Sequence, residues 1–169
     1  MSNLTKRLLP MLVANSVRLR QTRTYRALQQ TFAVIFPFVV IGAWAQMLEL
    51  SVFSRNGFFA VIYNLNKVIP FYTQMRTLLI AIENVTINLM AVMTAFFVAK
   101  YVARSYKKDD SLAAITSVGA FLILNLETRR NAQSVFQMNN LGYRGLFIAI
   151  IFGLLIGWLF RFTRADLEE

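Results

Sequence analysis

The residues of this chain best suited to chemistry lie at the start of a long apolar stretch. Glu83, Asn84, Thr86 and Asn88 fall in the first half of 78–100, which is otherwise mostly apolar. A helix of this length crosses a bilayer, because at about 1.5 Å per residue roughly 20 residues span the hydrocarbon core of about 30 Å. A charged side chain at the centre of such a helix costs about 2.5–3.5 kcal/mol, so neighbouring helices must surround this polar group.

Three interpretations of the polar group are open at the level of sequence. Its side chains line a small cavity that contacts an ion or a solute, or they form hydrogen bonds that hold helices together. In the third interpretation the span begins later, near Asn84, and Glu83 lies in water. Asn84 and Asn88 share one helix face because they are four residues apart. Arg76 and Arg144 are the candidate partners of the Glu83 carboxylate.

The composition indicates a membrane protein and excludes several kinds of site. Of 169 residues, 57% are hydrophobic and 15% are charged, whereas soluble domains carry about 25% charged residues. The chain has no cysteine and no histidine, so it has no disulfide framework and lacks the commonest metal ligand and acid–base group. The sequence contains no nucleophile–base pair, metal-ligand cluster or phosphate-binding loop. We therefore predict no metal, no cofactor and no enzymatic activity.

Four apolar blocks predict an all-α membrane protein with about four transmembrane helices. The blocks cover about 32–50, 78–100, 112–126 and 142–162, and together they form a single transmembrane domain, 32–162. Segment 1–31 is basic and amphipathic, which is typical of helices at the membrane surface. A second amphipathic stretch, 57–74, has apolar residues at three- and four-residue spacing and is expected to lie in the interface. The charged tail, 163–169, is short.

Orientation in a membrane explains the net charge of +10 better than nucleic-acid binding does. With four crossings, segments 1–31, 99–111 and 161–169 share one side and hold twice as many lysine and arginine residues as the other side. Cytoplasmic loops carry such an excess of basic residues. We therefore expect a multi-pass protein in a lipid bilayer, with both termini in the cytoplasm and no nucleic-acid partner.

A stripe of small residues runs along the last predicted span. Gly145, Ala149, Gly153 and Gly157 are four residues apart and therefore lie on one side of a helix. Small residues at this spacing let two helix backbones approach closely in a membrane. The stripe is interpreted as a helix-packing site, which faces either another helix of this chain or a second copy in a homodimer.

Short motifs follow one another in a fixed order along about residues 4–162. They are Leu8-Leu9-Pro10, Arg26-Ala27-Leu28, Phe36-Pro37, Ile41-Gly42-Ala43, Asn84-x-Thr86, Asp110-Ser111-Leu112-Ala113-Ala114, Leu141-Gly142 and Gly145-Leu146-Phe147-Ile148. Taken together, this series resembles the N-terminal half of the membrane permease, enzyme IIC (EIIC), of the sugar phosphotransferase system, in the lactose, cellobiose and diacetylchitobiose group.

The resemblance implies a scaffold more than a complete transporter. In that family the N-terminal half is the scaffold and carries the dimer contact. The other half holds the sugar pocket, a phosphorylation-linked histidine and a catalytic glutamate. This sequence stops at Glu169 and has no histidine, so no sugar-binding or catalytic residue is carried over.

Two functions follow from this resemblance. The first is a truncated EIIC-like protein of the bacterial plasma membrane. It would be a component or scaffold of a phosphotransferase-system oligosaccharide permease, homodimeric, with a separate chain supplying the missing substrate-binding half. The alternative is a repurposed membrane scaffold or assembly module that binds a partner protein or lipid without transporting sugar.

Overall fold

The computed structural model describes residues 22–54, 56–65, 69–128 and 134–163 of the chain. Its long helices are α2 (Arg23–Leu48), α5 (Tyr72–Thr86), α6 (Met90–Ser105), α7 (Asp110–Leu124) and α9 (Leu146–Leu159). The short ones are the π-helix η1 (Glu49–Phe53), α3 (Phe58–Tyr63), α8 (Met138–Leu141) and the 3-10 turns η2 (Tyr143–Gly145) and η3 (Phe160–Phe162). Strand β1 (Leu126–Thr128) pairs antiparallel with β2 (Ser134–Phe136).

Three helical stretches in the described residues are long and apolar enough to cross a membrane: Arg23–Tyr63, Tyr72–Ser105 and Tyr143–Phe162. Helix α7, which covers most of the predicted 112–126 span, is apolar but has only 15 residues. The prediction of an all-α membrane protein is confirmed, and the short β1–β2 hairpin does not change that class. The surface agrees with this class, because large apolar residues such as Phe147, Ile151 and Trp158 on α9 are exposed.

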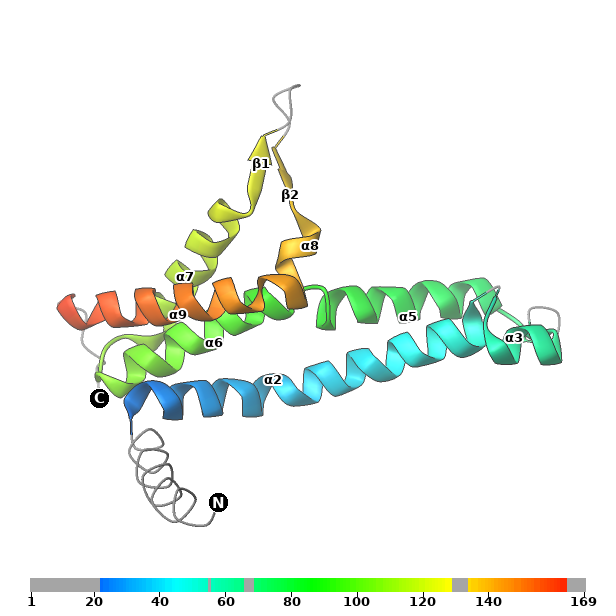
Figure 1. Cartoon of the computed structure of the whole chain (residues 1–169), viewed down its shortest axis with the longest axis horizontal. Helices are drawn as coiled ribbons and strands as arrows, with labels where there is room; N and C mark the ends of the chain where they lie inside the picture. Colours follow the sequence, from blue (N-terminus) through cyan, green and yellow to red (C-terminus); the bar gives the residue numbers. More distant parts are fainter. Residues whose placement is uncertain (1–21, 55, 66–68, 129–133, 164–169) are drawn as a thin grey trace, which may run out of the picture.

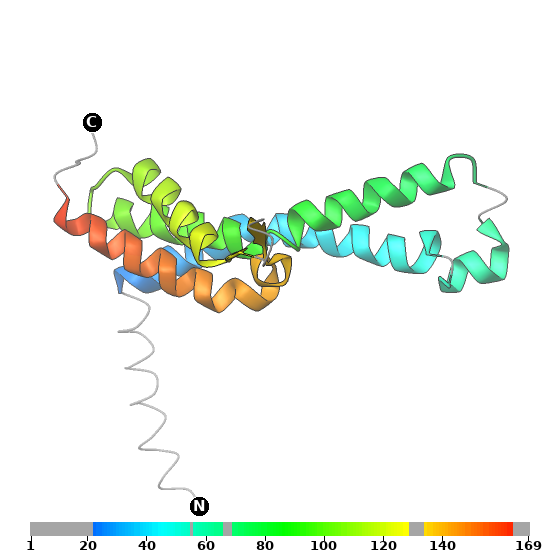
Figure 2. The same cartoon turned by 90° about the horizontal axis from the view of Figure 1, so that it is seen from above.

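Helix α6 is the centre of the structure, because α2, α7 and α9 all pack against it. These three helices and α6 form what we call the bundle, to which α2 contributes only its N-terminal half (Figure 1). The C-terminal half of α2 continues beyond the bundle and pairs with α5 to form an arm, which ends at η1 and α3 (Figure 2). Helix α2 therefore connects the bundle to the arm.

Small side chains explain why α6 sits at the centre. Ala91, Ala95, Ala99 and Ala103 are all fully buried and recur every four residues, so they form a stripe along α6. Ser117 of α7 adds a buried hydrogen bond, in which its hydroxyl donates to the Ala95 carbonyl at 3.0 Å. In a membrane such small residues replace the hydrophobic effect as the source of helix association, because they allow close backbone contact.

The stretch 78–100, expected as one helix, is helical in two pieces. Helix α5 ends at Thr86, α6 begins at Met90, and three turn residues separate them. The Glu83 carbonyl accepts from both Ile87 N (2.8 Å) and Asn88 N (3.3 Å), which disturbs the regular ladder. The break lies beside Gly142, where an added Cβ would come within 3.4 Å of the Ile87 carbonyl oxygen.

The stretch 57–74 does not form one helix either. Helix α3 ends at Tyr63, Asn64 and Phe71 have left-handed backbone angles (φ of 51° and 62°), and α5 begins at Tyr72. A residue with positive φ interrupts a right-handed helix, so the apolar spacing runs across a turn rather than along a single face.

The boundary predicted at residue 31 is also displaced. Helix α2 begins at Arg23, and the Thr22 hydroxyl caps it by accepting from Tyr25 N at 3.4 Å. Residues 23–31 therefore belong to the same helix as the predicted span 32–50, and that helix runs on through Pro37. The rest of the predicted amphipathic segment, 1–21, and the end of the tail, 164–169, lie outside the described residues.

Candidate functional site

The structure separates the four residues of the predicted polar group. Glu83 faces α2, where Gln46 Nε2 donates to Glu83 Oε1 at 3.0 Å. Asn88 Nδ2 donates to Asn84 Oδ1 at 2.7 Å, so these two side chains satisfy each other along their own segment. Thr86 donates to a carbonyl one turn earlier and is buried. Of the three interpretations, hydrogen bonding between helices describes Glu83.

Thr86 marks the closest approach of α5 to α2. A Cβ added to Gly42 of α2 would lie 2.2 Å from Thr86 Oγ1, well inside contact distance. A larger side chain at Gly42 would overlap Thr86, so α2 and α5 approach closely at this point. The polar contacts of the arm lie between this crossing and η1.

Neither of the two arginines expected beside Glu83 is its partner. Arg76 Nε instead lies 2.8 Å from Oε1 of Glu49, and the Glu49 side chain is only 8% exposed. Arg144 lies at the start of η2, exposed and next to the Tyr143 ring. The ion pair of the arm is therefore Arg76–Glu49.

A tyrosine completes the contacts at the end of the arm. The Tyr72 hydroxyl lies 3.0 Å from the Val52 carbonyl and 3.4 Å from the Ser54 carbonyl, and its ring packs 5.2 Å from that of Phe53. Val52 lies in the last turn of η1 and Ser54 follows that helix, where its carbonyl also accepts from Gly57 N at 3.0 Å. We call the three sets of contacts, Gln46–Glu83, Glu49–Arg76 and Tyr72 with η1, the polar row.

The polar row follows directly from antiparallel pairing. Moving from the bundle toward the tip of the arm, residue numbers rise from α2 into η1 (46, 49, 52) and fall along α5 (83, 76, 72). Glu49 is the member that sequence reasoning missed, since a carboxylate near the end of a span is inexpensive at the membrane interface. The sequence does carry a signal for this row. Gln46 and Glu49 are three residues apart, and Arg76 and Glu83 are seven apart, so each pair lies on one side of its helix.

The small-residue stripe of α9 packs against α6 of the same chain. A Cβ at Gly153 would lie 2.7 Å from Val98 Cβ, and one at Gly157 would lie 2.7 Å from Val102 Cβ. Ala149 is fully buried in the same interface. Gly145 instead belongs to a tight turn, where a Cβ would lie 1.7 Å from the Asn140 carbonyl oxygen. The stripe therefore matches the alanine stripe of α6, and its glycines are not left for a second copy.

The polar side chains of the row are engaged with one another. A buried carboxylate, a guanidinium and a carboxamide–carboxylate pair are each matched to a partner inside the arm. Within the described part of the chain, no group of three His, Cys, Asp or Glu residues could hold a metal ion. The row fixes the register of α2 against α5 while apolar residues such as Trp44, Met47 and Leu78 face outward.

We expect Glu83→Gln to leave the yield of folded protein unchanged and Glu83→Lys to lower it several-fold. Glutamine keeps an oxygen that accepts from Gln46 Nε2, whereas lysine removes the acceptor and brings a charge into the helix contact. Fluorescence-detected size-exclusion chromatography of the solubilised protein measures the yield. Equal yields from both variants would show that the hydrogen bond to Gln46 does not matter for folding.

Comparisons with known proteins agree with an integral membrane protein and point to one class of transporter. Neither a family model nor a solved structure matches the chain. The chain is similar to the PTS system oligo-beta-mannoside-specific EIIC component of Bacillus subtilis (strain 168), with 23% identity over 155 residues. The similarity covers 89% of this chain but 33% of that protein. The chain thus spans about a third of the length of the relative it matches.

Proposed function

We propose that this chain is the membrane scaffold part of an EIIC-like permease of the phosphotransferase system in a bacterial plasma membrane. The observation that carries the proposal is the similarity to the Bacillus subtilis EIIC component, which extends over 89% of the chain. The name of that relative suggests a β-linked oligosaccharide as the transported substrate. In this proposal both termini lie in the cytoplasm and the basic end of the bundle faces the cytoplasm.

The architecture supports a scaffold role. The α6–α9 interface is closed by glycine and alanine contacts, and the polar row is satisfied between α2 and α5. Such contacts hold helices in fixed positions, and each polar side chain of the row already has a partner within the arm. The residues that bind the sugar would therefore come from a separate chain, which packs on the apolar outer faces of the bundle or the arm.

Sugar binding tests the proposal directly. The full chain is purified alone and co-purified with the unmatched part of the Bacillus subtilis relative, and both samples are titrated with mannobiose and cellobiose by calorimetry. We expect the pair to bind a β-linked disaccharide with a dissociation constant below about 1 mM, equivalent to about −4 kcal/mol. The chain alone is expected not to bind.

Two controls make the result interpretable. The full-length relative, treated in the same way, must bind sugar, and maltose provides an α-linked disaccharide for comparison. If the two parts co-purify and neither sample binds any sugar, the permease proposal fails. A stable complex without sugar binding would instead favour a membrane assembly module.

A further inference from the structure

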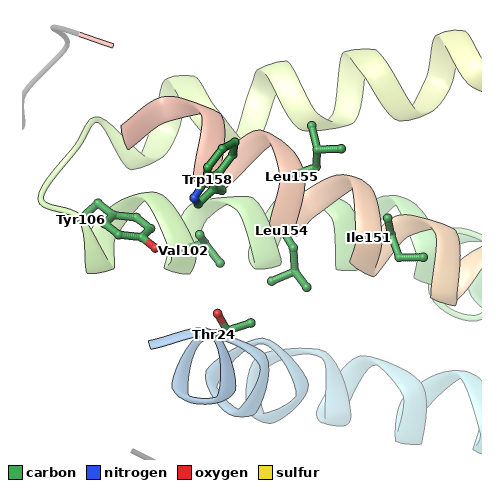
Figure 3. A pocket seen from close by; sticks show the side chains of 7 residues that line it. All are labelled: Thr24, Val102, Tyr106, Ile151, Leu154, Leu155 and Trp158. Carbon is green, nitrogen blue, oxygen red and sulfur yellow. The ribbon is translucent and has the colours of Figure 1, made fainter. Parts of the chain in front are cut away.

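A groove opens between α2 and α9 at the end of the bundle where α2 begins. Both helices pack on α6, and the space between them has a volume of about 370 Å³ (Figure 3). Its floor is Val102 of α6, and its α9 wall is apolar. The lining residues are Thr24, Val102, Tyr106, Ile151, Leu154, Leu155 and Trp158.

One end of the groove is polar, and the rest of it is apolar. The Tyr106 and Thr24 hydroxyls point into it near the start of α2, as Figure 3 shows. Leu154 and Ile151 extend the wall one and two turns farther along α9. Trp158 and Tyr106 lie at the polar end, and such amphipathic rings are enriched where membrane meets water.

Two arginines converge on the polar end. The Arg23 guanidinium lies 5.3 Å from the centre of the Tyr106 ring, and that of Arg161 lies 5.8 Å from the same ring. Arg23 Nη1 also donates to the Ser105 carbonyl at 3.4 Å. Both guanidinium groups therefore lie beside Tyr106, which lines the groove, and Arg23 also lines a neighbouring cavity with Arg26 and Arg104. The repulsion between two nearby like charges falls when an anion binds close to both.

The anion is not supplied by the described residues. Their ion pairs are Arg76–Glu49 in the arm and Arg104–Asp110 at 3.0 Å, so the nearby Asp110 carboxylate is already matched. Neither Arg23 nor Arg161 forms an ion pair with a described carboxylate.

We propose that this groove binds an anionic phospholipid, with its phosphate between Arg23 and Arg161 and one acyl chain along α9. A lipid fits because its charge and its apolar chain match the two parts of the groove in the same order. The groove faces outward from the bundle of a membrane protein, so lipid reaches it without entering the protein. Basic pockets between transmembrane helices take anionic headgroups in this way.

Native mass spectrometry of the full chain tests the proposal, with phosphatidylglycerol and phosphatidylcholine of identical acyl chains as probes. We expect phosphatidylglycerol to bind about thirty-fold more tightly, because each basic residue near an anionic headgroup contributes about five-fold. The variant Arg23→Gln/Arg161→Gln should reduce this preference to about two-fold or less. The variant Ile151→Trp should weaken binding of both lipids, because it fills the groove.

Arg144→Gln is the matched control, since Arg144 is an exposed arginine at the other end of the α9 segment. It should leave the preference unchanged, and all variants should elute as folded protein. The proposal is overturned if the double variant keeps the full preference or if both lipids bind the unmodified chain equally. It is also overturned if glycerol phosphate displaces the lipid at equal concentration, because the site would then bind a soluble phosphate.

Discussion

Replacing Gly153 and Gly157 together by leucine is expected to destabilise the bundle strongly and to lower the yield of folded protein several-fold. A Cβ at either position would already lie 2.7 Å from a valine Cβ of α6, which is shorter than real side-chain contacts. Overpacking costs about 1–3 kcal/mol for a single site, so two sites in one rigid interface cost about 2–6 kcal/mol, a large part of the roughly 5–15 kcal/mol by which native proteins are stable. The yield and melting temperature of the solubilised protein measure the loss.

Gly119 provides a matched control in the same bundle. A Cβ added there meets nothing within 4 Å, although Gly119 also lies on a membrane helix. Gly119→Leu should therefore keep the yield and shift the melting temperature little. If the Gly153/Gly157 double variant instead stays folded and only dissociates from a dimer, the stripe faces a second copy and not α6.

Arg76→Leu is expected to destabilise the arm strongly, because it leaves the Glu49 carboxylate buried without its partner. Removing one member of a buried ion pair costs about 3–5 kcal/mol. The lower end of that range applies, because the Arg76 side chain is 39% exposed while that of Glu49 is 8% exposed. The double variant Arg76→Leu/Glu49→Leu should recover most of this loss, since no unpaired charge remains. Unfolding titrations in mixed micelles give the free energies.

The control for the ion pair is Arg144→Leu, which removes an exposed arginine outside the arm. It should change the free energy of unfolding by less than about 0.5 kcal/mol, as surface substitutions usually do. The importance of the pair would be contradicted if Arg76→Leu behaved like this control. A double variant no more stable than Arg76→Leu would mean that the lost stability comes from the arginine stem and not from its charge.

The apolar blocks of the sequence predicted the class of fold because bilayer thickness sets the length of a crossing helix. Blocks 32–50 and 142–162 each fall largely within one helical stretch of the structure. The break at 87–89 was not predicted, since the apolar stretch 78–100 continues through it and shows no breaking residue there. The spacing of apolar residues also predicted one amphipathic helix over 57–74, although two residues within it take left-handed backbone angles.

The polar contacts were harder to predict than the helices. The sequence indicated that Glu83 needs a partner if it lies within the membrane, but the choice of Gln46 depends on the register of α2 against α5, and the Glu83 side chain is only half-buried. The same register pairs Arg76 with Glu49, which sequence reasoning did not single out. The glycine stripe of α9 was found from its spacing, whereas the alanine stripe of α6 was missed because alanine is common in any membrane helix. The homodimer stays a prediction, and it would need a surface other than Gly153 and Gly157.

The length of α2 has a consequence for the membrane itself. Its 26 residues extend about 39 Å at 1.5 Å per residue, whereas the hydrocarbon core is about 30 Å thick. The apolar part of α2 and the start of η1, about residues 32–50, is about 28 Å long and matches the core, so the first turns of α2, with Arg23 and Arg26, extend beyond the hydrocarbon. Because α2 joins the arm to the bundle, the depth at which these two arginines are held would set the depth of both together.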